Sequence, residues 1–219
     1  MLYIDERSSP TSSLRENIWM KEYNMNMERT NTLKINIIIG RFQPITTGHI
    51  KCATTAYEKT GCPTVLCMIE TPEAKADVRH PFPSSQLLPI YKELFSGPQD
   101  KSHIIDIILV KNADIVKIAE QCRDKGYEIR SWSCGTDRYD SYSKMAEKYA
   151  EKAGLPADFE VIEIKRGDED ESATKLRQAL RDDDKSTFFK MFPAIHLSTR
   201  LKVNIYDELR TQLLKIDSL

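Results

Sequence analysis

The sequence predicts an α/β protein with a Rossmann-like, five-stranded parallel sheet and helices on both faces. From residue 34 onward, short runs rich in β-branched residues alternate with longer helical stretches, which is typical of a parallel sheet with right-handed crossovers. The short runs are apolar on both faces, as a sheet that is covered on both sides requires. Gly61, Gly126 and Gly154 each follow a predicted helix, where a residue with positive φ is favoured.

Five strands and five helices follow from this alternation. The expected strands are Lys34–Ile39, Thr64–Glu70, Ile104–Val110, Glu128–Cys134 and Glu160–Ile164. The expected helices fill the stretches between and after them, at Ile50–Thr60, Ser85–Ser96, Ala113–Asp124, Asp140–Ala153 and Ala173–Arg181. Since the first four helices each stand between two strands, each strand–helix–strand unit predicts one parallel crossover.

The two ends of the chain differ from this pattern. Residues 1–32 include a Ser/Thr/Pro-rich stretch and have no sustained periodicity, which predicts a flexible arm or a segment that binds a protein partner. Residues 33–197 are predicted to form the domain. In residues 198–219, apolar side chains recur at intervals of four, which predicts an amphipathic helix packed on that domain rather than a zipper for a partner. These side chains are Leu201, Ile205, Leu209 and Leu213.

Composition and charge exclude several classes of protein. Lys and Arg number 32 and Asp and Glu 33, a formal net charge of -1, so no excess positive charge directs the whole molecule to nucleic acid or anionic lipid. The longest apolar runs are too short to span a bilayer, and no apolar segment of a secretory signal is present near residue 1. The five cysteines form no CxxC pair, which predicts reduced thiols and a cytoplasmic location. The histidines show no metal-ligand spacing, so no transition-metal site is expected.

A segment with phosphate-binding chemistry follows the first predicted strand. It reads Gly40-Arg-Phe-Gln-Pro-Ile-Thr-Thr-Gly-His49 and opens a helix at its end. Ligands bind beyond the carboxyl ends of parallel strands, and a helix N-terminus offers unpaired N–H groups and a positive dipole end to a phosphate. Gly40 and Gly48 allow a close approach of the backbone, while Arg41, Thr46 and His49 bring hydrogen-bond donors.

Two further groups of residues have related chemistry. In the segment Ser172–Arg177, Ser172 or Thr174 can cap a helix, and Arg177 lies one turn further on, so hydroxyls and a guanidinium can converge on an anion. After the fourth strand comes Gly135-Thr-Asp-Arg138. Asp137 can meet a ligand hydroxyl or amino group there, or it can cap the next helix. Trp132, on the strand before it, is either a core residue or a surface on which a base stacks.

These motifs resemble those of the nucleotidylyltransferase superfamily. GRFQP followed by TxGH resembles nicotinamide mononucleotide adenylyltransferases, while PITTGH is closer to the version found in pantetheine-phosphate adenylyltransferases. Ser172–Arg177 is similar to the SxTxxR motif of the superfamily, and Gly135–Arg138 to a GxDR motif of its bacteriophage-encoded members. Arg79–Pro83 with the later Glu93-Leu-Phe95 is similar to a loop and helix of those phage members. Two departures are Thr46 in place of the first His of HxGH, and Glu171 where Ile usually stands.

The resemblance implies an enzyme that transfers AMP from ATP, with Mg²⁺, to a phosphate-bearing acceptor, and nicotinamide mononucleotide is the first choice of acceptor. The alternatives are phosphopantetheine, cytidylyl transfer from CTP, or a non-catalytic nucleotide-binding or virion-associated protein; oligomeric state stays open. The implied catalytic residues are His49, Thr46 and Arg177. The implied nucleotide-binding residues are Gly40, Arg41, Phe42, Gly48, Gly135, Asp137, Ser172 and Thr174. The acceptor is expected to contact Lys75, Arg79, Trp132 and Arg138.

Overall fold

The chain folds around a five-stranded parallel sheet, as the sequence predicts. The computed structural model describes residues 32–97, 100–165, 172–194 and 196–219, so most of the predicted N-terminal arm lies outside the described residues. Residues Lys34–Leu219 form one compact unit. The strand order is β3-β2-β1-β4-β5. The strands are β1 Leu33–Gly40, β2 Thr64–Ile69, β3 Ile104–Val110, β4 Tyr127–Gly135 and β5 Glu160–Ile164.

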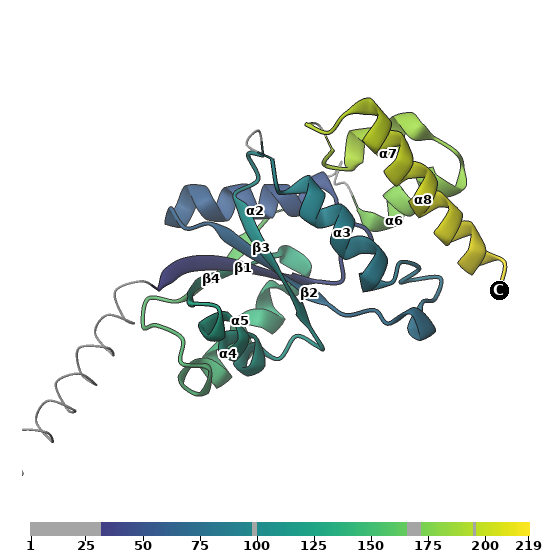
Figure 1. Cartoon of the computed structure of the whole chain (residues 1–219). Coiled ribbons are helices and arrows are strands. Elements are labelled where there is room, and N and C mark those ends of the chain that lie inside the picture. The colour runs from purple at the N-terminus through teal and green to yellow at the C-terminus, as the bar shows by residue number, and fades with distance from the viewer. Residues whose placement is uncertain (1–31, 98–99, 166–171, 195) are drawn as a thin grey trace, which may run out of the picture. The chain divides into compact units, whose positions relative to one another are not determined.

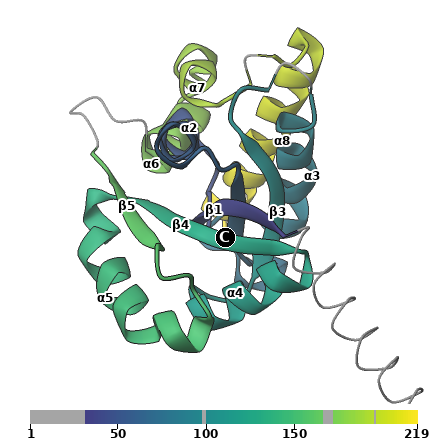
Figure 2. The ribbon, with the colours of Figure 1, turned by 90° about the vertical axis from the view of Figure 1, so that its left-hand side faces the viewer.

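Helices cover both faces of the sheet (Figures 1 and 2). Ile37 and Ile39 of β1 belong to one buried cluster together with α4 and α5. Ile38 points to the other face, where α2, α3, α6, α7 and α8 contribute to a second cluster, because successive side chains of a strand alternate between faces. The helices are α2 Thr47–Thr60, α3 Ser84–Leu94, α4 Ile115–Asp124, α5 Thr136–Ala153, α6 Ala173–Arg181, α7 Lys185–Met191 and α8 Thr199–Asp217, and a short 3₁₀ turn, η1, spans Glu73–Lys75.

The largest corrections to the predicted elements concern helices α5 and α7. Helix α5 begins at Thr136 with Gly135 as its N-cap, four residues before the predicted start. Asp137 therefore lies in the first turn, and the alternative that it caps the helix is wrong. Helix α7 has no counterpart among the predicted elements. It is short, and the side chain of Asp184 caps its start by accepting a hydrogen bond from the backbone N–H of Thr187. Asp184 is the last of three adjacent aspartates, so the sequence does not distinguish it as a helix cap.

The C-terminal helix α8 packs on the domain along the apolar stripe that the sequence contains. Ile205, Leu209 and Leu213 are buried in the same cluster as strand residues of β1 and β2, and Leu201 packs against it. Tyr206 is also buried there, and its hydroxyl donates to the Asp183 carboxylate between α6 and α7. None of the helices in the described ranges has the length and hydropathy needed to cross a membrane.

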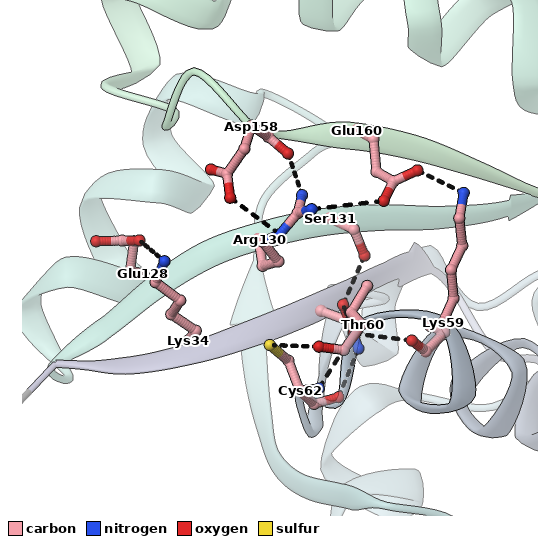
Figure 3. A network of polar contacts seen from close by, with 11 residues as sticks. Lys34, Lys59, Thr60, Cys62, Glu128, Arg130, Ser131, Asp158 and Glu160 are labelled. Carbon is pink, nitrogen blue, oxygen red and sulfur yellow. Dashed lines mark hydrogen bonds and ion pairs between the residues drawn. The ribbon is translucent and has the colours of Figure 1, made fainter.

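The amino-terminal edge of the sheet is held by polar contacts (Figure 3). Arg130 of β4 pairs with Asp158 and Glu160, and Glu160 also pairs with Lys59 of α2. Close by, the fully buried Asn36 accepts hydrogen bonds from the hydroxyls of Thr60 and Ser131 and donates to the carbonyl of Cys62. All of these contacts lie away from the carboxyl ends of the strands. They stabilise the amino-terminal ends of the strands, whereas ligands of such sheets bind at the carboxyl ends.

The strand order places two of the predicted motifs side by side. The order of the strands reverses between β1 and β4, which are neighbours in the sheet. Gly40 ends β1 and Gly135 ends β4, so the loops after both strands start at this topological switch point. Crevices at such points are where open α/β sheets bind their ligands.

Candidate active site

The loop after β1 is shaped by the ring of Phe42. A Cβ atom at Gly40 would lie 3.2 Å from Cε1 of Phe42, so this position has little room for a side chain. Phe42 has a φ of 48° and is 3% exposed, and its carbonyl accepts a 2.6 Å hydrogen bond from the hydroxyl of Tyr91. The ring meets the ring of His49 edge to face, with 5.1 Å between their centroids. The Phe42 side chain therefore supports the loop and His49, and a contact of this residue with a nucleotide stays a prediction.

His49 is fixed by the residue that caps helix α2. The backbone N–H of Thr46 donates to Nδ1 of His49 over 3.0 Å, and Oγ1 of Thr46 lies 3.0 Å from the same nitrogen. Because Nδ1 accepts from a backbone N–H, the neutral ring carries its proton on Nε2. Thr46 is 1% exposed, so its contact with the ring is shielded from water. The arrangement leaves Nε2–H as the hydrogen-bond donor of the ring.

Arg177 joins two motifs that are far apart in the sequence. Its Nη1 donates to the backbone carbonyl of Gln43 over 2.6 Å, and its Nη2 donates to Oγ1 of Thr174 over 3.2 Å. The SxTxxR helix α6 is thereby attached to the loop between β1 and α2. Burial lowers the pKa of Arg177, and the positive charge of Arg181 lowers it further, while Asp77 opposes both. The guanidinium thus lies in a positive and partly desolvated environment that an anion would stabilise.

Gln43 attaches the loop between β2 and α3 to the same place. Its Nε2 donates to the carbonyl of Phe82 over 2.7 Å, and its Oε1 accepts from the N–H of Phe82 over 3.0 Å. Upstream in this loop, the Asp77 carboxylate accepts hydrogen bonds from the backbone N–H groups of Arg79 and His80. The bonds to Phe82 attach this loop to the β1–α2 loop, and the bonds to Asp77 order the turn that carries Arg79.

These segments line an open cavity of about 850 Å³. Four of its side chains are arginines, from the β1–α2 loop, the β2–α3 loop and helix α6, and one is a carboxylate from α8. Such an excess of guanidinium groups, each with a fork of N–H donors, favours a ligand that carries phosphate groups. The lining residues are Arg41, Gln43, Val78, Arg79, His80, Thr174, Arg177, Gln178, Arg181 and Asp217.

Other predicted residues lie outside this cavity. Lys75 is exposed in η1 and does not line it, in contrast to Arg79. Ser172 caps α6, its hydroxyl accepting from the N–H of Lys175 over 3.1 Å. Asp137 and Arg138 are exposed at the carboxyl end of β4 and pair with each other over 3.5 Å. They lie beside the β1 loop through the strand order but do not line the cavity.

Trp132 is a core residue. It is fully buried and stacks on Tyr142 of α5, with 3.9 Å between the ring centroids. Its side chain points to the face covered by α4 and α5, so it offers no surface to a base. This corrects the expectation that Trp132 contacts the acceptor.

Six residues of the cavity, including Gln43, Arg181 and Asp217, are not among the site residues predicted from the sequence. Gln43 is part of the GRFQP motif, and its position between the predicted site residues Arg41 and Thr46 is a signal that could have identified it. Arg181 follows Arg177 by four residues and therefore lies on the same face of α6, a signal available in the sequence. Asp217 stands 40 residues after Arg177 near the end of the chain, and no local pattern indicates it.

The fold and the arginine-lined cavity beside the loop after β1 define an α/β domain with a site suited to an anion. The chain belongs to the cytidylyltransferase-like family, which matches residues 37–179. This match includes both His49 and Arg177, so the chain is a member of the nucleotidylyltransferase superfamily whose motifs it resembles.

Solved structures agree with this fold. A Vibrio parahaemolyticus protein assigned as a nicotinate-nucleotide adenylyltransferase has a TM-score of 0.50 and 13% identity, over 82% of this chain and 96% of that one. Nicotinic acid mononucleotide adenylyltransferase of Plasmodium falciparum, complexed with NaAD, has a TM-score of 0.50 and 14% identity, over 80% and 98%. A search of curated protein sequences finds no significant match. At these identities the structural likeness concerns the fold.

Proposed function

We propose that the protein transfers AMP from ATP to a phosphate-bearing acceptor, nicotinamide mononucleotide, to give NAD and pyrophosphate. The observation that carries this proposal is the bond from Arg177 to the carbonyl of Gln43. This bond connects the two motifs that would bind the triphosphate in a nucleotidyl transfer. One is the N-terminus of α2 with His49, and the other is the N-terminus of α6 with Thr174. The bond brings the start of α6 next to the loop that leads into α2, and the N-terminus of a helix favours a phosphate.

The reaction needs positioning and charge neutralisation more than acid–base chemistry. An oxygen of the acceptor phosphate attacks the α-phosphorus of ATP, and the bond from that phosphorus to the oxygen bridging the β-phosphorus breaks. The electron pair leaves with pyrophosphate, and no covalent enzyme intermediate forms. The Nε2–H of His49 donates to the oxygens on which negative charge grows, because the bond at Nδ1 fixes its tautomer. Arg177 and Thr174 hold the departing pyrophosphate.

Mg²⁺ fits this scheme as part of the substrate MgATP. Among the described residues, no group of three or more His, Cys, Asp or Glu side chains is placed to hold a metal ion. The cavity is rich in arginine instead, which suits the phosphate oxygens that Mg²⁺ leaves uncoordinated. Oxygens of the substrate and of water would hold the ion, as is usual for Mg²⁺ in phosphoryl transfer.

Arg79 is the residue that we assign to the phosphate of the acceptor. It lines the cavity from the β2–α3 loop, and the Asp77 carboxylate orders the turn that carries it. The names of the structural neighbours, one of them complexed with NaAD, support a pyridine mononucleotide as the acceptor. Both names give the nicotinic acid form, whereas the GRFQP motif favours the amide, so both mononucleotides belong in the test.

The test measures pyrophosphate release and product mass with MgATP and, in turn, nicotinamide mononucleotide, nicotinic acid mononucleotide and phosphopantetheine. CTP with phosphocholine runs beside them, because cytidylyl transfer is the alternative donor chemistry. We expect release with nicotinamide mononucleotide. Arg177→Gln should abolish most of it, while Arg200→Gln, at an exposed position near the start of α8, should not change it. Failure to bind ATP in a folded protein would favour the non-catalytic alternative, and release with another acceptor would correct the substrate.

A further inference from the structure

An ion pair connects the C-terminal helix to the cavity. Nε of Arg181 donates to Oδ2 of Asp217 over 2.7 Å, and Nη2 donates to Oδ1 over 2.9 Å. The two parallel bonds use one edge of the guanidinium and fix its plane, as in other bidentate arginine–carboxylate pairs. Both side chains are 26% exposed, and both line the cavity. The pair is therefore part of the wall of the site rather than a contact on the far surface.

Arg181 lies one turn beyond Arg177 on helix α6. The two positive charges oppose each other, and the presence of Arg181 lowers the pKa of Arg177. Holding two guanidinium groups on one face of a helix costs free energy unless a negative partner is nearby. Asp217 bonds to Arg181 and leaves Nη1 outside the two bonds. Arg177 instead bonds to neutral oxygens of Gln43 and Thr174, so the cavity keeps an excess of positive charge for a ligand.

Asp217 stands at an unfavourable position of its own helix. It is the last residue of α8, where the helix dipole places partial negative charge and disfavours a carboxylate. The pair with Arg181 offsets this cost. Five residues earlier, Nε2 of Gln212 donates to the carbonyl of Pro81 over 3.1 Å, in the loop that carries Arg79. Helix α8 thus contacts two walls of the cavity.

We propose that Arg181 binds the polyphosphate chain of the nucleoside triphosphate and that Asp217 positions it, which makes the C-terminal helix α8 part of the binding site. This inference rests on the proposed function and deepens it. Arg177 and Arg181 together present two guanidinium groups along α6, which suits two adjacent phosphate groups better than a single one. The chemical class of ligand is therefore a di- or triphosphate, and pyrophosphate is the smallest probe of it.

The test is calorimetric titration of the full chain with pyrophosphate and with MgATP, because neither titration depends on the acceptor. We expect Arg181→Gln to weaken pyrophosphate binding about tenfold or more, as the loss of a charged hydrogen-bond donor predicts. Arg181→Lys should bind pyrophosphate more tightly than Arg181→Gln but less tightly than the wild type, since lysine keeps the positive charge but lacks the paired N–H donors of the guanidinium. Asp217→Asn should weaken binding severalfold. Asp207→Asn is the matched control: it also removes a carboxylate of α8 from an ion pair, with Lys185, but Asp207 does not line the cavity and the affinity should stay unchanged.

Three results would overturn the inference. If Arg181→Gln binds pyrophosphate as tightly as the wild type while Arg177→Gln does not, Arg181 is no ligand for the chain. If Asp217→Asn lowers the melting temperature but not the affinity, the role of Asp217 is structural. If the wild type binds neither probe, the cavity is not a polyphosphate site. The proposed function fails on a different result, namely absence of turnover with every acceptor despite tight binding of MgATP.

Discussion

Substitution of His49 separates its role in folding from its role in the proposed reaction. The residue occupies the third position of α2, and its Nδ1 accepts from the backbone N–H of the N-cap residue Thr46. In the common capping box this third position is Glu or Gln. His49→Gln therefore keeps an acceptor for the Thr46 N–H but places no imidazole Nε2–H in the site. His49→Ala removes both.

The expected magnitudes differ for the two variants. Loss of a helix cap costs about 1 kcal/mol, and each kcal/mol shifts the melting temperature of a domain of this size by about 2–4 °C. His49→Ala should therefore melt about 2–4 °C below the wild type, and His49→Gln should stay close to it. Both should lose turnover on the order of a hundredfold or more, because the donor aimed at the developing charge is gone.

Two measurements check this prediction: thermal unfolding by circular dichroism, and pyrophosphate release with the acceptor that the wild type uses. The Gln variant is the informative one because its fold is preserved. Near-normal turnover of His49→Gln would refute the assignment of the imidazole to the reaction. A melting temperature of His49→Ala equal to that of the wild type would refute the capping role of the ring.

The other predictions concern the cavity, the core and the N-terminal segment. Arg177→Lys should lower kcat/KM at least about tenfold, because one ammonium cannot replace the fork that bridges two oxygens; steady-state kinetics with varied MgATP checks it. Arg79→Ala should raise the KM for the acceptor about tenfold, whereas Lys75→Ala should leave it unchanged; equal effects would contradict the different places of the two residues. Trp132→Phe should lower the melting temperature with no change in either KM, as expected for a buried ring, and a raised acceptor KM would restore the base-stacking interpretation. Removal of residues 1–30 should leave turnover intact, because every site residue named here lies beyond them; loss of activity in a folded product would show that the segment completes the site.

Much of the fold and part of the site follow from local patterns in the sequence. The strands β3 and β5 and helix α6 begin and end at the predicted residues, because β-branched runs and helix caps are short-range signals. The glycines after α2 and α5 have the expected positive φ, 69° at Gly61 and 62° at Gly154. The boundaries that differ, such as the start of α5, lie where a polar first turn carries no apolar periodicity.

Within the candidate site, the sequence indicated the segments but not how each side chain is used. Phe42 and Trp132 were predicted to contact ligands, yet both are buried. Aromatic rings near a motif look the same in sequence whether they face a ligand or a core, and only the packing on the two faces of the sheet distinguishes them.

The sequence alone therefore determined the class of fold, the phosphate-binding loop after β1, and the pairing of that loop with the Ser172–Arg177 segment by resemblance. The tertiary structure decided which residues share the cavity. The bond from Arg177 to Gln43 spans 134 residues and the bond from Arg181 to Asp217 spans 36. Contacts between residues so far apart leave no periodic signal along the chain, because only the packing of helices α6 and α8 on the sheet brings these residues together.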